Sequence, residues 1–151
     1  MNNSRFAYET YIRASRERVW QALTMPEFTK QYFHATHIES TFEKGAPVRF
    51  IYESEGDVAV EGEVIECDPP ALLSITWHVH YDVAAKAEAP SRVTFSLEEI
   101  NGQTKLRIVH DQFPDDSVVF AGISRGWPWI VSGLKSLLET GEPLPSLDPA
   151  A

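Results

Sequence analysis

The sequence predicts a single α+β domain of the helix-grip kind, in which a curved antiparallel sheet wraps around a long C-terminal helix, with two short helices after the first strand. Apolar and polar residues alternate in seven segments, as they do in strands that bury one face. The segment GWPWIVSGLKSLLETG, at residues 126–141, instead has its apolar residues at helical spacing. A length of 151 residues suits one domain.

The first three elements are expected within residues 5–33. The segment RFAYETYIRA alternates, and Ser15 then follows as a helix cap for RERVWQALT. Met25-Pro26 should end that helix, because the residue before proline avoids the helical region. A second short helix, PEFTKQYF, begins with Pro26 in its first turn. The residues expected on the inner face of the first strand are Phe6, Tyr8, Thr10 and Ile12.

Six further strands are expected between residues 36 and 111, in the segments 36–45, 47–54, 57–68, 71–81, 91–100 and 104–111. Asp68-Pro69-Pro70 is a strong break, and Asn101-Gly102 is a hairpin turn signal. Short connections favour an antiparallel sheet. The inner face is expected to carry Ile38, Ser40, Phe42, Val48, Phe50, Tyr52, Val58, Val60, Val64, Leu73, Ile75, Trp77, Val79, Tyr81, Val93, Phe95, Leu97, Leu106, Ile108 and His110.

The C-terminal helix should cover the dry face of this sheet. Its apolar stripe comprises Trp127, Ile130, Val131, Leu134, Leu137 and Leu138. The preceding residues 115–125 are either a separate helical piece or a loop, because Gly126 and Pro128 indicate a break or kink. Gly141 ends the helix, so the domain is expected to span residues 1–141 and residues 142–151 to form a flexible tail.

Gly133 is unusual in the middle of this helix, where glycine costs about 1 kcal/mol relative to alanine. It either leaves open space beneath the helix or lets the backbone pack closely on a strand. The inward polar groups leave a similar choice, since they either pair with one another or surround a watered pocket. His110, the inward histidine, is then a general base, a ligand-binding group or a satisfied core residue.

Composition and motifs exclude several functions. The formal net charge of −9 argues against nucleic acid and anionic membranes as partners. A single cysteine, Cys67, the absence of a signal peptide and the absence of a long apolar run predict a cytoplasmic protein without a membrane span. His78 and His80 share one strand face but have no third ligand nearby, so no metal is expected. No nucleotide or hydrolase motif occurs, and no cofactor is expected.

Three segments together resemble the START-like (SRPBCC) superfamily, and within it the bacterial homologues of the heat-shock-protein-90 ATPase activator, C-terminal domain type. They are ASRERVWQALTMPEFTKQYF (14–33), VHDQFPDD (109–116) and the helix at 126–141. The resemblance covers roughly residues 5–141. It implies a deep cavity between the sheet and the C-terminal helix. The eukaryotic activator has an additional chaperone-gripping domain for which this chain has no room, which argues against chaperone activation.

We therefore expect a cytosolic protein that binds a small apolar or amphipathic molecule in this cavity, with homodimer formation left open. One alternative is a cyclase- or hydratase-type enzyme that uses His110 or a buried tyrosine for proton transfer. Another is a partner-binding module that regulates a chaperone or a stress response. The residues expected to bind the ligand are Tyr8, Tyr52, Trp77, His110, Trp127 and Ile130.

Overall fold

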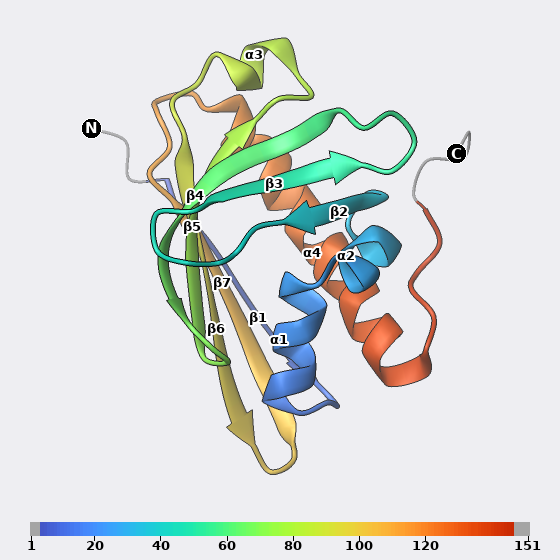
Figure 1. Ribbon diagram of the computed structural model, residues 1–151. Helices are drawn as coiled ribbons and strands as arrows, with labels where there is room; N and C mark the ends of the chain where they lie inside the picture. The colour runs from blue at the N-terminus through green and yellow to red at the C-terminus, as the bar shows by residue number, and fades with distance from the viewer. Residues whose placement is uncertain (1–3, 147–151) are drawn as a thin grey trace.

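A computed structural model describes residues 4–146, which form one antiparallel sheet and four helices (Figure 1). The strands are β1 (Phe6–Ile12), β2 (Thr36–Glu39), β3 (Pro47–Tyr52), β4 (Val58–Asp68), β5 (Leu72–Val79), β6 (Ser91–Ile100) and β7 (Gln103–Asp111). The helices are α1 (Arg16–Thr24), α2 (Pro26–Tyr32), α3 (Val83–Lys86) and α4 (Val118–Thr140). In the sheet the strands lie in the order β1-β7-β6-β5-β4-β3-β2. This is the predicted helix-grip architecture.

Helices α1, α2 and α4 lie on one side of the curved sheet, and α4 runs across it (Figure 1). The strand alternation decides which residues face them. Trp77 is 5% exposed and lies on the inner face, whereas its neighbour His78 is only half-buried, so the predicted register of β5 is correct. The predicted stripe of α4 is also confirmed, with Trp127, Ile130 and Leu134 among its buried residues.

Local signals set the helix boundaries as predicted. The Ser15 hydroxyl accepts a hydrogen bond from the Arg18 backbone N–H over 3.1 Å and caps α1. Pro26 occupies the first turn of α2, where its missing N–H costs no hydrogen bond. Gly141 ends α4 with a φ of 89°, in the left-handed region that glycine adopts easily.

Four details differ from the sequence prediction. Helix α4 is continuous from Val118 through Pro128, so residues 118–125 are neither a loop nor a separate piece. The short helix α3 was not predicted. Strand β2 ends at Glu39, and Phe42, with a φ of 60°, lies outside it. Strand β5 ends at Val79, so Tyr81 is not an inner-face strand residue and is 61% exposed.

Gly133 allows a close approach of two helices. A Cβ atom added at this position would lie 3.4 Å from the Cβ of Tyr32 in α2. This is an ordinary contact distance, and Gly133 also lines a groove beside α2, so each of the two expected roles has an observation in its favour, with a helix and not a strand as the packing partner. The hydroxyl of Tyr32 donates to the Ala22 carbonyl over 2.6 Å, which fixes α2 against α1.

Residues 142–146 carry no helix or strand. They turn back beside the end of α4, where the Ser136 hydroxyl donates to the Glu142 carbonyl over 2.7 Å. The remainder of the expected flexible tail, residues 147–151, lies outside the described residues.

Candidate functional site

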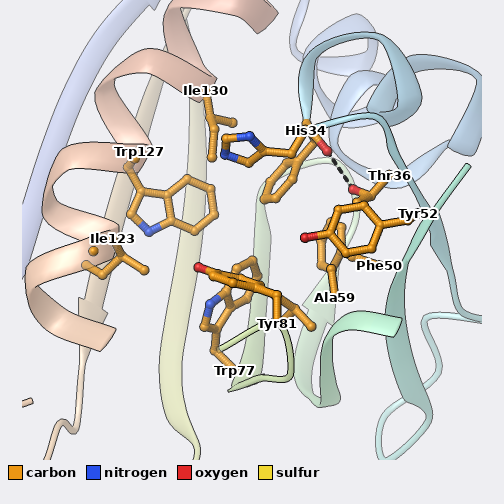
Figure 2. Close-up of a pocket in the computed structure, with 14 residues that line it drawn as sticks. His34, Thr36, Phe50, Tyr52, Ala59, Trp77, Tyr81, Ile123, Trp127 and Ile130 are labelled. Atoms are coloured by element: carbon orange, nitrogen blue, oxygen red, sulfur yellow. Dashed lines mark hydrogen bonds between the residues drawn. The ribbon is translucent and has the colours of Figure 1, made fainter. Parts of the chain in front are cut away.

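A pocket of about 100 Å³ lies between the sheet and α4 (Figure 2). Strands β3, β4 and β5 form one wall, α4 forms the opposite wall, and the segment after α2 closes one side. The residues that line it are Phe33, His34, Thr36, Phe50, Tyr52, Ala59, Val60, Trp77, Tyr81, Gly122, Ile123, Gly126, Trp127 and Ile130.

The inner part of this pocket is aromatic. The ring of Trp77 lies 5.3 Å from that of Trp127 and 5.3 Å from that of Phe50, measured between centroids. Phe33 stacks on Phe50 at 4.6 Å. The four rings are therefore in mutual contact across the sheet and α4, and they give the pocket an apolar interior that favours an apolar ligand.

Two glycines of α4 keep this interior open. Gly122 and Gly126 are one helical turn apart and both line the pocket. A Cβ atom added at either position would meet no heavy atom within 4 Å. The strand wall contributes small side chains as well, because the β-bulge at Ala59, where the pairing of β3 with β4 shifts, buries Ala59 and Val60 together.

The mouth of the pocket carries three polar side chains, those of His34, Tyr52 and Tyr81. All three also line a second, larger groove of about 570 Å³ that continues outward from the pocket. Figure 2 shows the imidazole and the two phenol hydroxyls directed toward the space beside Trp127 and Ile130.

His34 reaches this position through an unusual backbone. Its φ is 50°, and that of Ala35 is 54°, so two successive residues adopt the left-handed conformation between α2 and β2. Such conformations cost about 1–3 kcal/mol each and are found preferentially at functional sites. The imidazole packs beside Trp129, with ring centroids 5.0 Å apart.

Burial disfavours the charged form of each of these three groups. It lowers the pKa of His34, which favours the neutral imidazole. Burial, reinforced by the charge of Glu55, raises the pKa of Tyr52. The pKa of Tyr81, a residue that is 61% exposed overall, is raised by partial burial and then by the charges of Tyr52 and Asp82. Both phenols therefore stay protonated and able to donate a hydrogen bond.

His110 lies outside the pocket lining, buried behind Trp127. Its Nδ1 accepts a hydrogen bond from the Trp127 indole N–H over 3.0 Å, and its Nε2 lies 2.7 Å from the hydroxyl of Ser91. Burial lowers the pKa of His110 to about 3. With both ring nitrogens occupied, this histidine orients Trp127 and has no nitrogen free for a ligand.

Four of the six residues predicted from the sequence meet in the pocket: Tyr52, Trp77, Trp127 and Ile130. His110 does not line it, and Tyr8 lies on β1, half-buried, with its ring 6.3 Å from that of Phe6. Ligand binding by any of the six stays a prediction.

Sequence reasoning placed Tyr81 on the inner face but not among the ligand-binding residues, and it did not assign His34, Ala59 or the glycines of α4 to the pocket. The spacing of Gly122 and Gly126 is the one signal that could have been recognised, because it places two small residues on one helical face beside Trp127. A β-bulge and a left-handed backbone leave no comparable pattern in the sequence.

His78, on the outer face of β5, and His80, just beyond the end of that strand, have rings 4.8 Å apart and bind different partners. His78 Nε2 lies 2.8 Å from the Lys86 carbonyl oxygen, and His80 Nε2 lies 3.9 Å from a carboxylate oxygen of Glu61. Among residues 4–146, no three His, Cys, Asp or Glu side chains are arranged to hold a metal ion. In the same range, no helix has both the length and the apolar character needed to cross a membrane.

Comparison with known proteins identifies similar chains. A family model described as Activator of Hsp90 ATPase homolog 1-like protein matches residues 13–139. No curated protein is significantly similar in sequence. The solved structure of protein MLL2253 from Mesorhizobium loti is 28% identical, with a TM-score of 0.76, and the match covers 90% of this chain and 97% of that one.

Two further solved structures are similar. DynU16, from the dynemicin biosynthetic locus, is 25% identical with a TM-score of 0.74, and the match covers 92% of this chain and 48% of that one. The Aha1 dimer from Colwellia psychrerythraea is 21% identical with a TM-score of 0.72, and the match covers 91% and 98% of the two chains. The likeness to the Colwellia protein shows a shared fold.

Proposed function

Because the chain belongs to the family of Activator of Hsp90 ATPase homolog 1-like proteins, within the START-like superfamily, we propose that it binds a small apolar or amphipathic molecule between the sheet and α4. The observation that carries this proposal is the aromatic pocket that Gly122 and Gly126 leave open. A pocket used only for packing would be filled, since protein interiors are close-packed and an unfilled cavity lowers stability.

The size of the pocket limits what it can hold. A ligand group that buries about 100 Å² of apolar surface gains roughly 2.5 kcal/mol at 25 cal/mol per Å². Micromolar binding needs about 8 kcal/mol. The ligand must therefore also use the polar mouth or extend into the groove beyond it, which favours an amphipathic molecule over a purely apolar one.

A cyclase- or hydratase-type enzyme is a second candidate. The observation in its favour is the convergence of one imidazole and two phenols at the mouth, because proton transfer needs positioned titratable groups. His34 with Tyr52 or Tyr81 would supply this chemistry, whereas His110 is fully hydrogen-bonded. A hydratase would change the mass of the bound molecule by one water, and a cyclase would rearrange it with or without loss of water, so chromatography combined with mass spectrometry of the molecule after incubation separates the two candidates.

The binding proposal is tested by adding bulk to the pocket wall. We expect a broad series of small apolar and amphipathic molecules to include at least one that changes the fluorescence of Trp77 and Trp127. Gly126→Leu should weaken the binding of that ligand by about tenfold or more, because the leucine side chain occupies the open space. Ala121→Leu adds bulk to an exposed position of the same helix and should leave binding unchanged.

Two results would count against this function. One is that no molecule in the series binds, and the other is that Gly126→Leu binds the ligand as well as the unmodified protein does. The chain would then be better treated as a partner-binding module.

We also propose a homodimer, supported by the dimer of the Colwellia protein. Light scattering of the purified protein measures its mass in solution.

A further inference from the structure

We propose that the mouth formed by His34, Tyr52 and Tyr81 recognises an acidic head group, and that the ligand is a small monocarboxylic acid carrying one apolar ring or short branched chain. This inference rests on the proposed function and specifies the class of its ligand. It is carried by the hydrogen-bonding state of the mouth, by the charges around the groove and by the size of the inner pocket.

The mouth offers donors that have no acceptor among the described residues. Within residues 4–146, the hydroxyls of Tyr52 and Tyr81 make no hydrogen bond, although each lies at the entrance of an apolar pocket. Phenol hydroxyls that remain protonated donate most strongly to an ionised acceptor. A carboxylate has two oxygens and can accept from both tyrosines at once, whereas an ammonium group accepts from neither.

The described lining of the groove carries positive and no negative charge. Among residues 4–146, no Asp or Glu lines the pocket or the groove. Glu55 and Asp82 lie outside both linings, although their negative charges help to raise the pKa values of the two tyrosines. The groove contains Lys30, which makes no ion pair with any of the described residues. Lys30 thus provides a positive charge beyond the mouth.

The inner pocket sets the apolar part of the ligand. A dry cavity of about 150 Å³ lined by apolar side chains holds a benzene molecule. The present pocket, at about 100 Å³, is smaller, so it accepts a short branched chain or one ring that extends partly into the mouth, and no fused ring system. Because the mouth joins the pocket directly to the groove, a ring inside places an attached carboxylate beside the two tyrosines.

The test compares three molecules with the same phenyl ring and four-carbon skeleton: 4-phenylbutyrate, 4-phenylbutan-1-ol and 4-phenylbutylamine. Calorimetry near pH 7 should rank the carboxylate first, about tenfold or more tighter than the alcohol, because a hydrogen bond to a charged group is worth more than a neutral one. The amine should bind most weakly. The carboxylate is better hydrated than the alcohol, so apolar burial alone predicts the opposite order.

Single substitutions assign the effect to residues. We expect the affinity for 4-phenylbutyrate to fall several-fold to about tenfold in each of three variants, Tyr52→Phe, Tyr81→Phe and Lys30→Gln. The affinity for the alcohol should change less. The contribution of Lys30 to the affinity for 4-phenylbutyrate should become smaller at high salt, because salt screens the charge. His34→Asn keeps a residue that tolerates the left-handed backbone and should weaken the acid in the same way. Tyr11→Phe, on the exposed face of β1, is the matched control and should change nothing.

The outcomes separate the two proposals. If the alcohol or the amine binds as well as the carboxylate, the acidic-ligand inference is wrong while the proposed binding function stands. The same conclusion follows if the carboxylate binds best but the mouth variants, folded by circular dichroism, retain its full affinity. If none of the three molecules binds, the acidic-ligand inference is wrong, and the broad ligand series decides separately whether the proposed binding function stands.

Discussion

The indole N–H of Trp127 donates a hydrogen bond to Nδ1 of His110 over 3.0 Å, which ties α4 to β7 directly behind the pocket. Because an indole can only donate, Nδ1 is the acceptor and the ring proton of the neutral imidazole lies on Nε2. Nε2 then donates to the hydroxyl of Ser91 on β6 over 2.7 Å, and that hydroxyl donates to the Trp77 carbonyl of β5 over 3.4 Å. One chain of hydrogen bonds thus positions both pocket tryptophans.

Removing the middle of this chain should destabilise the protein. Ser91→Ala leaves the Nε2–H of His110 buried without a partner, which costs about 1–3 kcal/mol in the free energy of unfolding. Urea denaturation followed by circular dichroism measures this loss. Ser96→Ala, on the opposite face of the same strand, is the control and should change stability by less than about 0.5 kcal/mol. Equal stability of the two variants would contradict the assigned hydrogen-bond chain.

The pH dependence of stability should carry the signature of His110. The unfolded chain protonates this residue near the ordinary histidine pKa of about 6.5, whereas burial lowers the pKa in the folded protein to about 3. The unfolded state therefore binds more protons between these values. The stabilising contribution is complete above about pH 6.5 and is lost as the pH falls toward 3, with a slope of about 1.4 kcal/mol per pH unit.

His110→Gln isolates this effect, because every other titrating group remains, including His34 and His80, whose pKa values burial also lowers. The free energy of unfolding of the variant should fall less steeply below pH 6.5 than that of the unmodified protein. Denaturation midpoints measured at several pH values between about 4.5 and 7.5 provide the comparison. Parallel profiles would mean that His110 is not kept neutral by burial.

Most of the fold could be predicted because it depends on local patterns. The alternation around Trp77 and His78 determines which face of β5 is buried, and the apolar spacing of α4 determines which side of the helix covers it. Ser15 marks the start of α1 by a side-chain hydrogen bond that is local in sequence. Pro128 was misleading, since proline usually breaks a helix, whereas the packing of α4 over the sheet maintains it.

The site was less predictable because it depends on departures from those patterns. Ala59 enters the pocket through a β-bulge, and His34 reaches the mouth through a left-handed backbone. Tyr81 lies beyond the end of β5, where alternation no longer determines direction. His110 was recognised as an inward residue, but only the structure shows that Trp127 and Ser91 occupy both of its nitrogens.

Glu88 should stabilise the start of α4 from outside the helix. Its carboxylate accepts hydrogen bonds from the Ser117 hydroxyl over 2.6 Å and from the Val118 backbone N–H over 2.7 Å. A negative charge at this end also interacts favourably with the helix dipole. We expect Glu88→Ala to lower the free energy of unfolding by about 1–2 kcal/mol, and Glu88→Gln, which keeps one acceptor, to lower it less. Chemical denaturation that ranks the two variants equally would exclude a capping role.

Gly62 should tolerate no side chain. A Cβ atom built on it would lie 1.8 Å from the Thr76 carbonyl oxygen of the neighbouring strand β5, so the backbone of β4 or β5 would have to move. Gly62→Ala is expected to cost at least about 2 kcal/mol of stability, measured by thermal or urea unfolding. A variant as stable as the unmodified protein would show that the two strands lie further apart than described.

Gly126→Ala should have the opposite effect on stability and a measurable cost in binding. The position lies inside α4, and an added Cβ meets no heavy atom within 4 Å, so the higher helix propensity of alanine is gained without a clash. The expected gain is about 0.5–1 kcal/mol, or roughly 1–4 °C in Tm. The new methyl group also narrows the open pocket, so affinity for a ligand that fills it should fall.

Calorimetry for stability and fluorescence titration for binding, run on the same preparation of Gly126→Ala, test both effects. A variant that is less stable would show that Gly126 makes a backbone contact that requires glycine, and one that binds unchanged would place the ligand away from α4.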